Sequence, residues 1–129
     1  REKYLEHGAF NRRSGGYDAA MTLLQRNKDD LPTALCAASA SMLMGSFSAI
    51  CDCGLRVPED ISLIGIDEVD MAMYTTPPLS IVAASCESAA KETVQRLIEL
   101  VEIGNASQRD YVIPDVELYM RESVLRINT

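Results

Sequence analysis

The chain has 129 residues, of which 47% are hydrophobic, so it is the size of one domain and can bury an apolar core. Twelve Lys and Arg residues against nineteen Asp and Glu residues give a net charge of −7, which argues against direct binding to nucleic acid or to anionic lipid. The apolar runs are far shorter than the roughly 20 residues of a membrane helix, and the N-terminal segment lacks a signal-peptide core. The sequence therefore predicts a soluble protein.

Four cysteines and one histidine are the residues most suited to metal binding or nucleophilic chemistry. The cysteines lack metal-ligand spacing, because a C-x-C pair within a helix directs its two thiols to different faces. We expect the cysteines to be buried small hydrophobic residues in a reducing compartment, and His7 to lie at the surface. The four cysteines are Cys36, Cys51, Cys53 and Cys86. The sequence thus predicts a cytoplasmic protein with no metal site, no catalytic group and no cofactor.

In the first half of the chain, helical and extended patterns alternate. Ser14 can cap an amphipathic helix over 15–27. The apolar run TALCAA predicts a strand over 33–38. The next segment is long enough for a helix over 40–53, which Gly54 ends.

The alternation continues in the second half. The segment ISLIGI is apolar on both faces, which predicts a buried strand over 61–66, parallel and adjacent to the strand over 33–38. Two prolines precede an extended segment over 79–84, and a helix follows over 87–103. The tail predicts two short extended pieces around Pro114. This order predicts an α/β fold, a three-layer sandwich with a mainly parallel sheet.

A carboxylate directly follows the second predicted strand. In open parallel α/β sheets the ligand crevice lies beyond the carboxyl ends of the strands, and two loops leave such ends here, at 38–41 and 67–70. The ionised side chain of Asp67 can accept hydrogen bonds from hydroxyl or amine groups of a small ligand. It can equally cap the short turn over 68–74. Spacing alone leaves both roles open.

Six segments of the sequence occur in the order and spacing of the lactose-repressor/galactose-repressor (LacI/GalR) family of bacterial transcription regulators. They are GYDAAMTLL, PTALCAAS, MLMG, GLRVPEDISLIGID, TTPPLSIV and PDVELYMRESV. The chain resembles this family from about residue 8 to residue 125, and the most specific part is GLRVPEDISLIGID followed by PPL. The resemblance implies part of a periplasmic-binding-protein-like effector domain, in which two α/β lobes are joined by crossing strands.

The resemblance also implies how this chain divides between the lobes. Residues 1–78 and 111–129 would belong to the C-terminal lobe, and residues 79–110 would supply a crossing strand and a helix of the N-terminal lobe. The family's helix-turn-helix has no counterpart in this sequence, so DNA would be bound only through a missing N-terminal domain. The implied ligand is a small effector, a sugar or a nucleobase-like molecule, held between the lobes.

The resemblance assigns roles to individual residues. Asp67 matches the acid that hydrogen-bonds the effector, and Ser39 matches a small or amide residue that often faces the ligand. Phe10 lies near the place of an aromatic residue that often stacks on the effector, although a core Phe is an equally good interpretation. Ala40 stands where the family commonly has an acid, so either Ser39 caps the following helix or the pocket differs in what it holds.

A homodimer is implied as well, paired through the C-terminal lobes. The helix over 40–53 is apolar nearly all round, so one side can lie on the sheet while the other needs a partner. The expected interface residues are Met44, Phe47, Ser48, Cys51 and Tyr74.

The leading interpretation is the ligand-sensing and dimerisation portion of a transcriptional repressor, in which the effector changes the angle between the lobes. The alternatives are a periplasmic sugar-binding transport receptor of the same fold and a small α/β enzyme. Cysteines without evident pairing and the missing signal sequence argue against the receptor. The enzyme is disfavoured because the sequence has no phosphate loop, no G-x-S-x-G turn and no histidine placed as a base.

Overall fold

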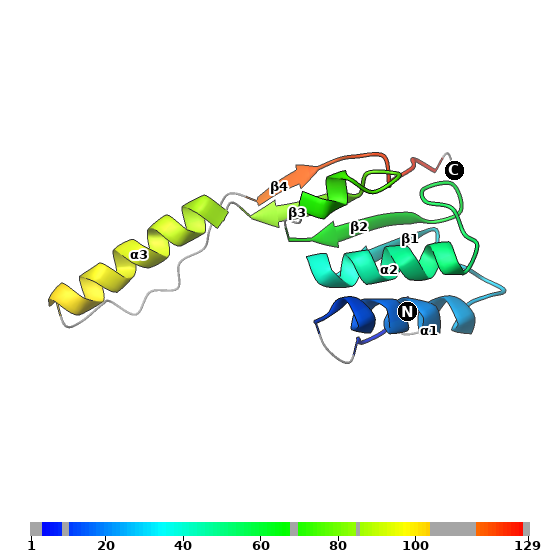
Figure 1. The fold of residues 1–129 in the computed structure, drawn as a ribbon, viewed down its shortest axis with the longest axis horizontal. Coiled ribbons are helices and arrows are strands. Elements are labelled where there is room, and N and C mark those ends of the chain that lie inside the picture. Colours follow the sequence, from blue (N-terminus) through cyan, green and yellow to red (C-terminus); the bar gives the residue numbers. More distant parts are fainter. Residues whose placement is uncertain (1–3, 9–10, 68–69, 85, 104–115, 128–129) are drawn as a thin grey trace.

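The computed structural model describes residues 4–8, 11–67, 70–84, 86–103 and 116–127 (Figure 1). The strands form one four-stranded sheet in the order β1-β2-β3-β4. The strands are β1 (Ala34–Ala37), β2 (Ser62–Ile66), β3 (Ser80–Ala84) and β4 (Val116–Tyr119). The helices are α1 (Arg13–Arg26), α2 (Ala40–Asp52), α3 (Cys86–Ile103) and the short 3-10 helix η2 (Asp70–Met73).

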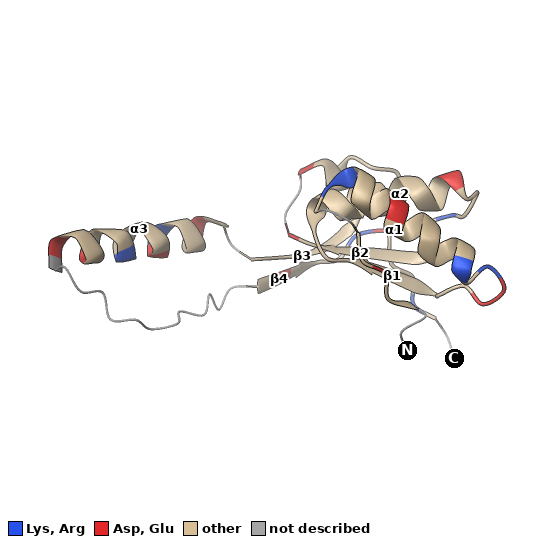
Figure 2. Ribbon diagram, turned by 90° about the horizontal axis from the view of Figure 1, so that it is seen from below, with Lys and Arg blue, Asp and Glu red and all other residues tan. Residues whose placement is uncertain are grey.

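The sheet is mainly parallel. β1 pairs with β2, with Leu35 opposite Leu63, and β2 pairs in parallel with β3. β4 is antiparallel to β3 and ends the sheet on that side. The predicted α/β class and the parallel pairing of the first two strands are confirmed. In the described residues, α1 and α2 together cover one face of the sheet (Figure 2).

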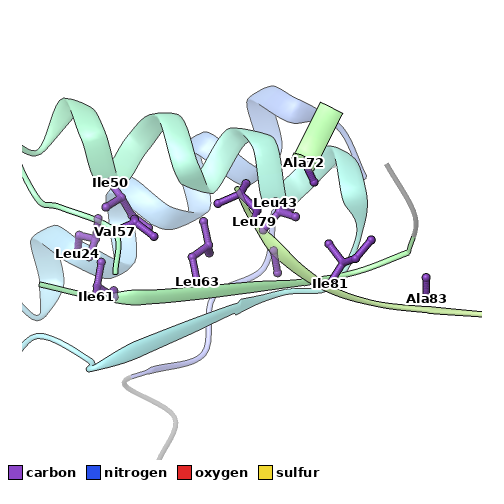
Figure 3. Close-up of a cluster of buried hydrophobic side chains, with 11 residues drawn as sticks. Leu24, Leu43, Ile50, Val57, Ile61, Leu63, Ala72, Leu79, Ile81 and Ala83 are labelled. Atoms are coloured by element: carbon purple, nitrogen blue, oxygen red, sulfur yellow. The ribbon is translucent and has the colours of Figure 1, made fainter. Parts of the chain in front are cut away.

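The hydrophobic core lies between α1 and α2 and the sheet (Figure 3). Leu43 of α2, Leu63 of β2 and Leu79 before β3 have no solvent exposure. They come from α2, from β2 and from the segment just before β3, so their burial holds α2 against the centre of the sheet. The whole cluster comprises Leu24, Ala37, Leu43, Ile50, Val57, Ile61, Leu63, Ala72, Leu79, Ile81 and Ala83.

The termini of α2 follow the sequence signals. Ser39 is the N-cap, and its hydroxyl accepts a hydrogen bond from the backbone N–H of Met42. After the helix, Gly54 has a φ of 73°, a left-handed conformation that glycine adopts without strain. The predicted helix over 40–53 is confirmed to within one residue.

The start of α1 differs from the prediction. The helix begins at Arg13 with Arg12 as the N-cap, and no side chain makes a capping hydrogen bond, so the expected cap by Ser14 is wrong. The first turn lies close against α2 instead: a Cβ at Gly45 would lie 2.0 Å from the carbonyl oxygen of Arg13. The first turn of α1 is thus packed against α2 and has no side-chain cap.

The cysteines are a second correction. All four side chains are exposed, so the expectation of buried thiols is wrong. Cys36 lies on β1, which pairs on one side only within the described residues, and Cys51 and Cys53 lie at the end of α2. Cys86 begins α3. His7, expected at the surface, is exposed.

α3 lies away from the sheet, beyond the end of β3 and the start of β4 (Figure 1). It carries the exposed apolar side chains Val94, Leu97, Ile98, Leu100 and Val101. The predicted helix over 87–103 is confirmed to within one residue. Pro114 lies outside the described residues, whereas 116–119 forms an edge strand, as the tail pattern predicts. No helix among the described residues is both long and apolar enough to span a membrane.

Candidate functional site

The candidate site lies where β1, β2 and β3 end, which is also where α2 begins; we call this region the carboxyl end of the sheet. Parallel strands finish at the same end of a sheet, and polar groups that follow them are therefore brought together. Ser39 follows β1 and Asp67 follows β2. The chain also leaves this end through β3 towards α3 (Figure 1).

Asp67 has an unusual backbone conformation. Its φ is 74°, in the left-handed region that non-glycine residues rarely occupy and that is found preferentially at functional sites. Its backbone N–H donates to the carbonyl of Val82 at 2.9 Å, which holds the residue against β3. The side chain is exposed, and among the described residues its carboxylate makes no hydrogen bond. Residues 68 and 69 lie outside the described part of the chain, so the alternative role as a turn cap stays a prediction.

Ser39 is almost fully buried, with an exposed fraction of 6%. Its hydroxyl accepts from the backbone N–H of Met42 at 3.3 Å and donates to the side-chain carbonyl of Asn11. Ser39 therefore caps α2, which was the first of the two interpretations offered for Ala40. Its hydroxyl proton is already used within the protein.

Asn11 is a further polar residue at this end of the sheet that no sequence pattern indicates. It lies just before α1 and is exposed, 28 positions away in sequence from its partner Ser39. Only the fold brings the two together, so no local pattern could have found the pair. Phe10, the predicted aromatic contact, lies outside the described residues.

The residues predicted at a dimer interface have different surroundings. Met44 and Phe47 are half-buried and pack against the core, whereas Cys51 is exposed and Tyr74 is 80% exposed. Ser48 faces α1, because its hydroxyl accepts a 3.4 Å hydrogen bond from the Arg13 guanidinium. Because the structure contains a single chain, the role of these residues at a dimer interface stays a prediction.

The electrostatics offer no activated nucleophile among the groups with shifted pKa values. Desolvation, followed by the neighbouring Asp52 carboxylate, raises the pKa of the Cys51 thiol. The hydrogen bond to Asp52 raises the pKa of Tyr17. Both groups are therefore protonated at neutral pH. Among the described residues, no three His, Cys, Asp or Glu side chains are grouped to hold a metal ion.

Comparison with known proteins relates this architecture to periplasmic binding protein-like domains. Residues 1–124 match the family model of the periplasmic binding protein-like domain. The HTH-type transcriptional repressor PurR of Glaesserella parasuis serovar 5 is 35% identical over 119 residues, which cover 88% of this chain and 34% of that protein. The probable HTH-type transcriptional repressor ExuR of Bacillus subtilis is 32% identical over 129 residues, 100% of this chain and 38% of that protein.

Solved structures of transcription regulators have the same fold as this chain. The complex of the transcriptional regulator CelR with cellobiose superposes with a TM-score of 0.85 at 28% identity, over 95% of this chain and 36% of that one. The lac repressor dimer bound to operator and the anti-inducer ONPF gives a TM-score of 0.77 at 30% identity, over 89% of this chain and 39% of that one.

The chain spans little more than a third of the length of the curated relatives named above. These relatives are transcriptional repressors and not enzymes, in agreement with the interpretation that this chain performs no catalysis. The chain belongs to the periplasmic binding protein-like domain family and corresponds to part of the effector domain of LacI/GalR-type transcription regulators.

Proposed function

We propose that this chain is the ligand-sensing and dimerisation portion of a cytoplasmic bacterial transcriptional repressor. It binds a small effector, a sugar or a nucleobase-like molecule, between two lobes. Residues 1–78 and 111–129 form one lobe, and residues 79–110 supply a strand and helix of the other. DNA is bound by a separate domain of the whole protein, whose operator contacts respond to the angle between the lobes.

The observation that carries the proposal is the placement of Asp67. An ionised carboxylate at the carboxyl end of a parallel sheet lies where ligands bind in open α/β folds. Its left-handed backbone and its N–H bond to Val82 fix the position of a side chain that is exposed. A carboxylate held in this way can accept hydrogen bonds from the hydroxyl or N–H groups of an effector.

The position of α3 supports the same proposal. The chain leaves the sheet through β3 at the end that carries Asp67, and α3 lies beyond that end (Figure 1). Any ligand held by Asp67 is therefore near the connection to the second lobe. The transport receptor with the same fold is the weaker alternative, because the named relatives are repressors.

The test is the affinity of Asp67→Asn in the full-length protein. Calorimetry would use cellobiose, D-ribose and hypoxanthine as probes. Cellobiose is bound in the CelR complex, and D-ribose is suggested by a ribose operon repressor of Haemophilus influenzae that is 31% identical. Hypoxanthine represents the nucleobases. Loss of a charge-assisted hydrogen bond costs about 1.5–3 kcal/mol, so the affinity for the probe that binds should fall about ten- to a hundredfold.

Asp29→Asn is the matched control, because Asp29 is an exposed acid in the turn after α1. It should leave the affinity unchanged. Equal affinity of Asp67→Asn and the parent would reduce Asp67 to a structural role and remove the main support for the proposal.

A further inference from the structure

A single hydroxyl proton determines the orientation of the Asn11 side chain. The Ser39 hydroxyl has one proton to donate, and one of its lone pairs accepts from the Met42 N–H. Because Ser39 is 6% exposed, its proton requires an acceptor within the protein, and that acceptor is Oδ1 of Asn11. The amide of Asn11 is therefore oriented with its oxygen towards Ser39.

This orientation leaves the amide nitrogen of Asn11 as the outward group. Asn11 is exposed, and its Nδ2 makes no hydrogen bond within the described residues. An amide nitrogen carries two N–H donors and no acceptor. The outward nitrogen of Asn11 thus offers only donors, whereas the carboxylate of Asp67 offers only acceptors.

The two groups lie at the same end of the sheet. Asn11 is bonded to Ser39, which follows β1, and Asp67 follows β2, the neighbouring strand. The strands that Ser39 and Asp67 follow are neighbours, about 4.8 Å apart, so the donor held by Ser39 and the acceptor of Asp67 belong to the same edge of the sheet.

We propose that Asn11 is an effector-binding residue, oriented by Ser39, which donates an N–H bond to an acceptor oxygen or nitrogen of the effector. The proposal rests on the effector-binding function proposed above. It narrows the effector class: the ligand offers a hydrogen-bond acceptor to Asn11 and a hydroxyl or N–H donor to Asp67, as polyhydroxylated sugars and lactam bases do. Ser39 acts as a positioning residue and does not need to touch the ligand.

Asn11→Asp is a nearly isosteric test. An Asp side chain still accepts the Ser39 proton, but it replaces the two N–H donors with a second acceptor. In the full-length protein the affinity for the bound probe among cellobiose, D-ribose and hypoxanthine should fall about tenfold or more, since a hydrogen bond is lost and two acceptors are opposed. The melting temperature without ligand should remain at or above that of the parent, because an acid before α1 favours the helix N-terminus.

A double-mutant cycle tests the positioning role. Ser39→Ala should lower both the stability and the affinity, because it removes the cap of α2 and frees the Asn11 amide. Its effect on affinity should largely vanish in the Asn11→Asp background, since the residue on which it acts is already changed. Fully additive losses of affinity would show that Ser39 does not act through Asn11.

The outcomes separate this inference from the proposed function. A normal affinity in Asn11→Asp, together with a loss in Asp67→Asn, would overturn the role of Asn11 and keep the effector site. A normal affinity in Asp67→Asn with a loss in Asn11→Asp would support Asn11 and overturn the central role of Asp67. A parent protein that binds none of the three probes would overturn both the effector site and the proposed ligand class.

Discussion

At the scale of single residues, Arg56 and Asp60 form an ion pair with several hydrogen bonds. The backbone N–H and the guanidinium of Arg56 make three hydrogen bonds of 2.8 Å to the Asp60 carboxylate. The side-chain hydrogen bond from Arg56 is the main cause that lowers the pKa of Asp60 to about 2. A carboxyl group whose pKa is lowered by folding stabilises the protein above its unfolded pKa of about 3.9, and this contribution is lost as the pH falls towards 2.

Asp60→Asn should therefore lower the melting temperature slightly at pH 7, because the pair is solvent-exposed. Its difference from the parent should shrink between about pH 4 and pH 2, where the parent loses the contribution of the ionised carboxylate. Thermal unfolding followed by circular dichroism over this range measures both effects. Glu59→Gln is the neighbouring control, and identical pH profiles for Asp60→Asn and the parent would contradict the assignment.

Ser123 is the second informative residue. It is fully buried; its hydroxyl donates to the Leu63 carbonyl at 2.6 Å and accepts from the Ser80 N–H at 2.7 Å. Ser123→Ala leaves both backbone groups buried without this partner, at about 1–3 kcal/mol for each. Urea denaturation should show a loss of about 2 kcal/mol or more. Ser41→Ala, at an exposed position in α2, should be nearly neutral, and a comparably small loss for Ser123→Ala would show that water replaces the hydroxyl.

The sequence could place some of these residues but not their partners. The position of Asp67 follows from a buried apolar strand and a family motif, both of which are local. The bonds of Ser39 to Asn11 and of Ser123 to Leu63 join residues 28 and 60 positions apart. Such contacts depend on the finished fold, so the donor at the candidate site and the residue that links β2 to β3 could not be predicted from spacing.

At the scale of elements, the close approach of α1 to α2 depends on Gly45. A Cβ there would lie 2.0 Å from the Arg13 carbonyl oxygen and 2.6 Å from the Tyr17 nitrogen. Both are backbone atoms of α1, so they can move away only if the helix itself shifts. Gly45→Ala should therefore lower the free energy of unfolding by about 1–3 kcal/mol, despite the higher helix propensity of Ala. Urea denaturation beside Ser41→Ala measures this, and a stabilised Gly45→Ala would show that the helices separate at little cost.

The elements that the sequence predicted closely are those with a hydrophobic pattern and terminal signals of their own. The strands over 33–38 and 61–66 and the helix over 40–53 have hydrophobic patterns and terminal signals of their own, and their bounds agree with the structure within one residue. The first turn of α1 lies against α2, and this interhelical contact carries no signal within the helix itself. The exposure of the cysteines likewise has no signal in the sequence, because a thiol within an apolar run can face either the core or the solvent.

At the scale of the whole molecule, we predict that the chain forms a homodimer through α2 and the segment around Tyr74. Exposed apolar side chains gather near that segment: Tyr74 is 80% exposed, Met71 58% and Met73 49%. Met44→Asp would place a charge at the half-buried centre of the proposed interface and should dissociate the pair. Light scattering at tens of micromolar compares the parent with this variant.

Ser41→Asp adds the same charge at an exposed position of α2 and should leave the dimer intact. A monomeric parent would contradict the prediction. A Met44→Asp variant that remains dimeric would move the contact elsewhere, most directly to β1, which pairs only with β2 within the described residues.

The pairing of β3 with β4 has a mechanical consequence. The chain departs for α3 after Ala84 and re-enters the sheet at Val116, and these two residues are opposite one another in the register. The two residues at which the chain leaves and rejoins the sheet therefore lie one strand spacing apart, about 4.8 Å, on neighbouring strands. One of these two strands, β3, also contributes the Val82 carbonyl that holds Asp67, so any displacement of the attachment point at Ala84 acts on the same strand that positions the candidate site.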